Sequence, residues 1–132
     1  MTELASTLTP REIASQAAHA ISVLTELTHS GGELSNPSDV RAIVTSLELI
    51  GQGLPQLCEQ LARFLVVQHE DGQLTNADGL DSGDSVTEVI EALAAAGQAA
   101  DMMTAAFTEA RTATQPLTPA RHRGWEGRPD AE

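Results

Sequence analysis

The 132-residue chain contains nineteen acidic side chains, seven arginines and no lysine, which gives a formal net charge of −12 at pH 7. Binding to nucleic-acid phosphates or to anionic membranes requires a positive surface, so this charge disfavours both partners. The length suits one domain with a self-supporting core. The chain has two phenylalanines, one tryptophan and no tyrosine, so that core has to be built from aliphatic side chains, which favours helices over sheets.

Two features of the sequence indicate the cellular compartment of the protein. Cys58 is the single cysteine, which excludes an intramolecular disulfide and is typical of a reducing compartment. The N-terminal residues lack the basic and apolar regions of a signal peptide, and no apolar run approaches the roughly 18 residues that a membrane span needs. We therefore expect a cytoplasmic protein without a membrane partner.

The first predicted helix covers residues 10–30. Thr9 can cap it, Pro10 suits its first position, and Glu12 completes a capping box with Thr9. Apolar residues then recur at the spacing of one helix face, at Ile13, Ala17, Ala20, Ile21, Leu24 and Leu27. The run Ser30-Gly31-Gly32 predicts the end of this helix.

The second predicted helix runs from Pro37 to about residue 69, with Asn36 as its cap. Its apolar seam consists of Val40, Ile43, Val44, Leu47, Ile50, Leu54, Leu57, Leu61, Phe64 and Leu65. Pro55 removes a backbone hydrogen bond, so the helix is expected to be kinked or split there. The seam keeps its phase across Pro55, which favours a kink; a split would instead give a four-helix bundle.

The third predicted helix follows a linker, residues 70–84, whose glycines and acidic residues predict mobility. Ser85 and Glu88 form another capping-box pattern, which predicts that the helix begins at Ser85. Its apolar face consists of Val86, Val89, Ile90, Leu93, Ala100, Met103, Phe107 and Ala110.

A second stripe of mostly small residues lies beside that face. It consists of Ala92, Ala95, Ala96, Ala99, Met102 and Ala106. Because the stripe widens the apolar surface beyond what one neighbouring helix covers, we expect it to contact another subunit. Residues 1–115 are therefore predicted to form an all-α, antiparallel three-helix bundle that assembles as a homodimer.

Residues 116–132 contain three prolines and two glycines without any periodicity, which predicts a disordered C-terminal tail. Trp125, the single tryptophan, lies in this tail among arginines. Tryptophan and arginine are frequent anchors of protein interfaces, so Trp125 is a candidate docking residue.

One pattern suggests a metal site. Glu26 and His29 form an E-x-x-H sequence, as found in di-iron helical bundles. Such sites need two of these patterns together with further glutamates, whereas this chain has one. A homodimer could duplicate it, with Glu48 or Glu59 as added ligands, but a solvated polar face is the simpler interpretation. We expect no bound metal and no cofactor.

Two other patterns are also partial. Asn76, Asp78 and Gly79 fit the middle of a calcium-binding loop, but the end positions of that loop are not carboxylates. Residues 8–12 and 34–36 resemble pieces of the helix-turn-helix domain of LuxR-type regulators. No basic recognition helix follows them, and helix capping explains both pieces, so DNA binding is not expected.

The side chains that could act in catalysis are few. Cys58 lies beside apolar Leu57 and is typical of a small core residue, while His19 lies on the polar side of the first helix. His69 lies at a helix end, where it can offset the helix dipole. Because the sequence contains no Ser/His/Asp spacing, phosphate-binding loop or CxxC motif, we expect a protein that is not an enzyme.

The composition of the chain also resembles that of proteins from one group of bacteria. The absence of lysine, the frequent arginine and alanine, and the many polar threonines look like a protein from a GC-rich actinomycete. In general character the three predicted helices resemble uncharacterised small acidic helical proteins of such bacteria, some of them carried on plasmids or integrated elements. The resemblance implies no site residue, because it includes no functional motif.

These observations favour a non-enzymatic protein–protein interaction module with an adaptor, regulatory or structural role. Its expected partner is another protein, first of all a second copy of the same chain. The acidic charge suggests an alternative, a nucleic-acid mimic that inhibits a DNA-binding protein. A second alternative is a dimeric, ferritin-like metal-binding bundle.

Overall fold

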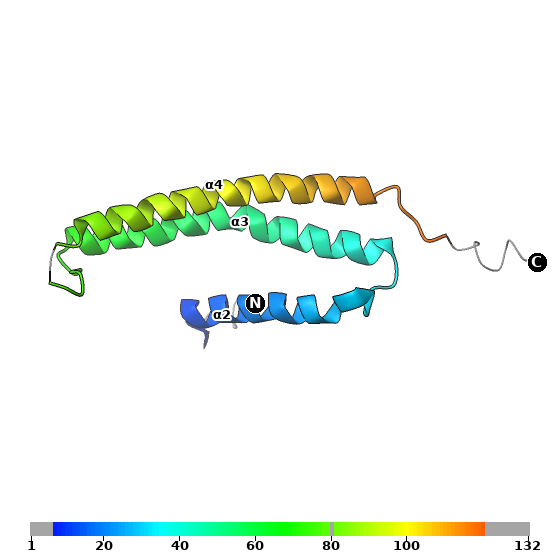
Figure 1. Cartoon of the computed structure of the whole chain (residues 1–132), viewed down its shortest axis with the longest axis horizontal. Coiled ribbons are helices and arrows are strands. Elements are labelled where there is room, and N and C mark those ends of the chain that lie inside the picture. Colours follow the sequence, from blue (N-terminus) through cyan, green and yellow to red (C-terminus); the bar gives the residue numbers. More distant parts are fainter. Residues whose placement is uncertain (1–6, 80, 121–132) are drawn as a thin grey trace, which may run out of the picture. The chain divides into compact units, whose positions relative to one another are not determined.

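The structure, a computed structural model, describes residues 7–79 and 81–120 (Figure 1). The regular elements of these residues are α2 (Pro10–Leu27), the short 3-10 helix η1 (His29–Gly31), α3 (Pro37–Glu70) and α4 (Gly83–Thr114). Within the described ranges there is no β-strand, which confirms the predicted all-α class. The chain divides after Ser35 into two compact units, which are described separately below.

The first unit contains α2, and its N-terminus has the predicted capping box. The Glu12 N–H donates to the Thr9 hydroxyl at 3.2 Å, and the Thr9 N–H donates to the Glu12 carboxylate at 3.0 Å. The helix ends at Leu27, earlier than the predicted residue 30. Thr28, with φ −94° and ψ 2°, is the C-cap, and the left-handed φ of 57° at Ser30 prevents the α-helix from resuming.

The second unit begins with α3, which is capped by Asn36 as predicted. The Asn36 side chain accepts a hydrogen bond from the Ser38 N–H at 2.8 Å, and the Asn36 N–H donates to Asp39 at 3.4 Å. The helix continues without a break past Pro55 to Glu70. The alternative with a split helix and a four-helix bundle is therefore wrong, because the loss of one hydrogen bond at proline does not end the helix.

Helix α4 begins at Gly83 and not at the predicted Ser85. Ser82 takes the N-cap position, and the first helical hydrogen bond joins the Val86 N–H to the Ser82 carbonyl at 2.9 Å. The Ser82 hydroxyl does not cap α4. It is buried against the end of α3, where it donates to the Leu74 carbonyl at 3.2 Å and bonds His69 Nδ1 at 3.0 Å.

Helices α3 and α4 pack against each other along their lengths as a hairpin (Figure 1). At one end, Arg41 near the beginning of α3 donates to the Thr114 carbonyl at the end of α4, at 2.8 Å. At the other end, His69 in the last turn of α3 meets Ser82. The two helices therefore run in opposite directions, and residues 71–82 connect them.

The interface of this hairpin is built on small residues. A Cβ atom added at Gly51 of α3 would collide with the Thr104 hydroxyl of α4. A Cβ atom added at Gly97 of α4 would lie 3.5 Å from Pro55 Cα of α3. Glycine is therefore needed for the close approach at Gly51, whereas a Cβ atom at Gly97 would make an ordinary van der Waals contact. Of the large apolar side chains predicted to line the α3 seam, several remain outside this contact.

Candidate interaction surface

A buried polar cluster holds the two helices of the hairpin in register. Glu48 of α3 is 7% exposed. Its carboxylate accepts a hydrogen bond from Arg111 Nε at 2.6 Å, a second from Arg111 Nη2 at 3.2 Å, and a third from the Thr108 hydroxyl at 2.6 Å. Because these three donors come from α4, a sliding movement between the helices would break all of them.

Hydrogen bonding also sets the ionisation of this cluster. The bonds from Arg111, and then that from Thr108, hold the pKa of Glu48 below its ordinary value of 4.5, although burial acts in the opposite direction. The same carboxylate raises the pKa of Arg111. Glu48 is therefore a charged partner of Arg111 and lies at the helix interface, so it is not a free ligand for a metal.

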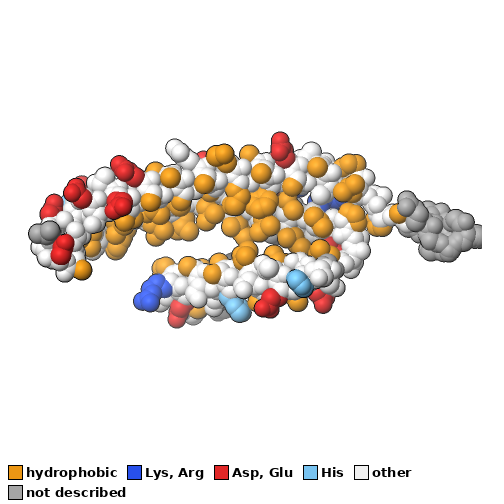
Figure 2. All heavy atoms as spheres, viewed as in Figure 1, with side chains coloured by type: hydrophobic (Ala, Val, Ile, Leu, Met, Phe, Trp, Pro, Cys, Tyr) orange, Lys and Arg blue, Asp and Glu red, His pale blue; other side chains and the backbone are white. Residues whose placement is uncertain are grey.

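One side of the hairpin carries large apolar side chains that neither helix covers. On α3 these are Ile50, Leu57, Leu61 and Phe64, and on α4 they are Val89 and Met103; all six are exposed. Phe64 is the most exposed of them, at 60%. We call these six residues the apolar face. Figure 2 shows apolar side chains gathered over the hairpin. Within each helix they recur at spacings of three, four, seven or fourteen residues, so they share one side of it.

The small-residue stripe predicted on the third helix is exposed over its whole length. Ala92, Ala95, Ala96, Ala99, Met102 and Ala106 are all exposed, and Met102 reaches 74%. At 100° per residue the stripe lies on the side of α4 opposite Gly97, the residue that faces α3. The structure thus leaves the stripe uncovered by α3. Trp125, the remaining candidate interaction residue, lies outside the described residues.

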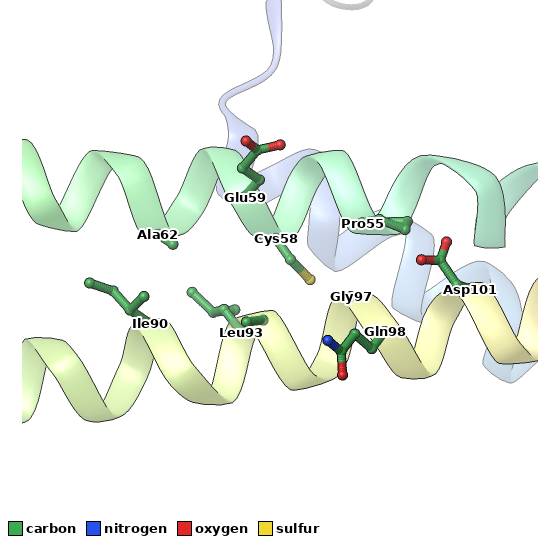
Figure 3. A pocket seen from close by; sticks show the side chains of 10 residues that line it. Pro55, Cys58, Glu59, Ala62, Ile90, Leu93, Gly97, Gln98 and Asp101 are labelled. Carbon is green, nitrogen blue, oxygen red and sulfur yellow. The ribbon is translucent and has the colours of Figure 1, made fainter.

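The other side of the hairpin has a shallow groove of about 350 Å³ (Figure 3). Pro55, Cys58 and Ala62 of α3 and Ile90, Leu93, Ala94 and Gly97 of α4 form its apolar lining. Glu59, Gln98 and Asp101 contribute polar groups. By the helical repeat, Glu59 and Asp101 lie on the opposite side of their helices from Leu57 and Met103. The groove is therefore separate from the apolar face.

The residues of the predicted metal pattern do not come together as a site. Glu26 lies in α2, whereas His29 lies beyond the end of that helix, in η1. The α-helical spacing that would put them on one face is therefore lost. Of the two added glutamates, Glu48 binds Arg111, and Glu59 forms an exposed ion pair with Arg63 at 3.0 Å. The described part of the chain holds no cluster of three potential metal ligands.

The residues considered for catalysis are also separate from one another. His19 is exposed on α2, and Cys58 is a half-buried free thiol that lines the groove. His69 bonds Ser82 and thereby ties the end of α3 to the beginning of α4. In the calcium-like segment, the Asn76 side-chain amide donates to the Asp81 carbonyl at 3.3 Å. The Asn76 side chain therefore stabilises the connection between α3 and α4.

Comparisons with known proteins do not assign the chain to a family. No protein-family model, no curated protein and no solved structure matches the chain. None of the helices in the described ranges is both long and apolar enough to span a bilayer.

The periodicity of the sequence did not predict that the apolar face would be exposed. The pattern assigned Ile50, Leu57, Leu61 and Phe64 to a seam in contact with a neighbouring helix. In the hairpin, the positions that face α4 are instead Glu48, Gly51, Pro55, Cys58 and Ala62. The glycine, proline and alanine at these positions, spaced by three or four residues, were the available signal for a second packing stripe.

Proposed function

We propose that the protein is a non-enzymatic protein–protein interaction module, and that the apolar face of its hairpin binds a second copy of the chain. The observation that carries this proposal is the exposure of the six large side chains of the apolar face. By contrast, Val86 and Ala100 are the buried apolar residues of the described chain. A hairpin with so little buried apolar surface gains stability by covering the rest.

The expected gain from covering this face is large. Burying a fully exposed Leu, Ile, Val, Phe or Met side chain contributes about 1.5–3 kcal/mol. The six side chains are 38% to 60% exposed, so each would contribute roughly half of that, before the cost of association is subtracted. None of the six residues of the apolar face is charged, and the carboxylates Glu59 and Asp101 line the groove on the other side of the hairpin. A twofold dimer would bury the same face on both copies.

The proposal also includes the packing of the helices of one chain into a bundle. The first unit carries exposed apolar residues of its own on α2, namely Ile13, Ile21, Val23 and Leu27. The antiparallel three-helix bundle predicted from the sequence would use these residues, and a kink at Pro55 would let α3 curve around its neighbours. The cytoplasm is the proposed location, as a lone cysteine favours.

Size-exclusion chromatography with light scattering at micromolar concentration tests the proposal. The wild-type chain is expected to have the mass of a dimer, and Leu61→Glu that of a monomer with unchanged helicity by circular dichroism. Gln56→Glu is the matched control, because Gln56 is exposed on α3 but outside the apolar face. A monomeric wild type would overturn the proposal. A dimer that survives Leu61→Glu but is lost in Ala99→Glu would place the interface on the small-residue stripe instead.

A further inference from the structure

We propose that the C-terminal segment of residues 121–128 docks into the groove of its own hairpin and places Trp125 against the apolar lining. This segment lies outside the described residues, so the inference rests on the groove, on charge and on the length of the chain. It does not depend on the proposed dimer, because the groove and the apolar face lie on opposite sides of the hairpin.

The groove suits an aromatic side chain with basic neighbours. Its floor is apolar, and its volume of about 350 Å³ is within the range of sites that hold small organic groups. In Figure 3 the side chains of Ile90 and Leu93 lie between the helices, while Glu59 lies at the edge. Asp101 is an exposed carboxylate of the lining, whereas the exposed carboxylate of Glu59 already forms an ion pair with Arg63. An indole ring with arginines beside it would match this combination of floor and rim.

Charge favours the same occupant. Residues 121–128 contain three arginines and one glutamate, whereas residues 36–115 contain twelve carboxylates and three arginines. The tail segment is thus the most basic part of an acidic chain. This segment is attracted to the acidic hairpin, whereas a second whole copy, with a net charge of −12, would be repelled.

The tail is long enough to reach the groove. Arg41 Nη2 lies 3.4 Å from the Leu117 carbonyl, which places Leu117 at the open end of the hairpin. The eight residues from Leu117 to Trp125 span up to about 27 Å when extended. Along α4, the seventeen residues from Thr114 back to Gly97 cover about 26 Å, so the extended segment reaches the near end of the apolar lining. Because the segment is tethered, its effective concentration at the groove is high.

Tryptophan fluorescence of the full-length chain tests the inference. Trp125 is the single tryptophan and the chain has no tyrosine, so the emission reports on this residue alone. We expect a blue-shifted emission and reduced quenching by acrylamide, relative to the urea-unfolded chain, at every protein concentration. Ala94→Arg, which puts a positive side chain into the groove, should shift the emission to that of the unfolded chain. Ala95→Arg is the matched control and should leave the emission unchanged, since Ala95 is exposed but outside the groove.

Three results would overturn the inference. They are a wild-type emission equal to that of the unfolded chain, a blue shift that persists in Ala94→Arg, and a blue shift that disappears on dilution, which would indicate the tail of another copy. If Ala94→Arg loses helicity by circular dichroism, Gln98→Arg at the rim replaces it with the same expected shift. The emission does not depend on Leu61, so Leu61→Glu separates failure of this inference from failure of the proposed dimer.

Discussion

Glu48 and Arg111 are sixty-three residues apart in the sequence and meet across the α3–α4 interface, with Arg111 Nε 2.6 Å from Glu48 Oε1. The Arg111 side chain is about one-third exposed, while that of Glu48 is almost fully buried. The pair therefore differs from Glu59 and Arg63, whose side chains are both mostly exposed on a single helix. Loss of the buried pair is therefore expected to affect stability more than loss of the exposed pair.

Replacement of Glu48 by alanine should lower the thermal stability of the hairpin, because Arg111 and Thr108 both lose their acceptor at the interface. Glu59→Ala, which breaks the exposed pair, should change the melting temperature little. The measurement is thermal unfolding followed by circular dichroism. Glu48→Ala combined with Arg111→Ala should cost less than the two single effects added together, since the residues share one interaction. Equal effects of Glu48→Ala and Glu59→Ala would contradict this role for Glu48.

The depressed pKa of Glu48 predicts a pH dependence of stability. The carboxylate binds protons more weakly in the folded than in the unfolded chain, so its contribution is fully present above the ordinary value of 4.5. The contribution is lost as the pH falls through the lower folded-state pKa. Urea unfolding of wild type and Glu48→Gln from pH 7 downwards should therefore give a stability difference that shrinks below about pH 4.5. A difference that is independent of pH would contradict the assignment.

Two glycines of α3 should respond in opposite ways to alanine. Gly53 has open space around its Cβ position, so Gly53→Ala should stabilise the helix by about 0.5–1 kcal/mol. Gly51→Ala should destabilise it by roughly 1–3 kcal/mol, because the new methyl group collides with the Thr104 hydroxyl. Urea unfolding measures both effects.

The collision at Gly51 can be tested further from the other helix. Thr104→Ala removes the hydroxyl and should recover most of the stability lost in Gly51→Ala. If the double variant is no more stable than Gly51→Ala alone, the close approach of the two helices at this point is not what requires glycine.

Two serines at the beginning of α4 distinguish the predicted helix start from the observed one. Ser82→Ala should cost about 1 kcal/mol, because its buried hydroxyl links His69 to the Leu74 carbonyl. Ser85→Ala should be close to neutral, since Ser85 is exposed and lies inside the helix. Hydrogen exchange of the amides in the connection between the helices gives a second measurement. A larger effect of Ser85→Ala would favour the capping box predicted from the sequence.

The local elements of this protein are determined by its sequence alone. The capping box at Thr9 and the cap at Asn36 satisfy helix-end N–H groups with side chains only two or three residues away, so nearby residue types suffice to predict them. The same holds for the helical class and for the continuity of an apolar period through Pro55. Each of these features depends on interactions within a few turns of one helix.

Tertiary structure decided which helix faces meet. The apolar pattern assigned the largest side chains of α3 to the contact, whereas the hairpin packs through Gly51 and Glu48, because glycine permits close approach and the carboxylate finds its donors on α4. The start of α4 likewise depends on Ser82 reaching His69, thirteen residues away. Such choices are made by partners distant in sequence. Periodicity within one helix therefore predicts that an apolar face exists, but not which neighbour covers it.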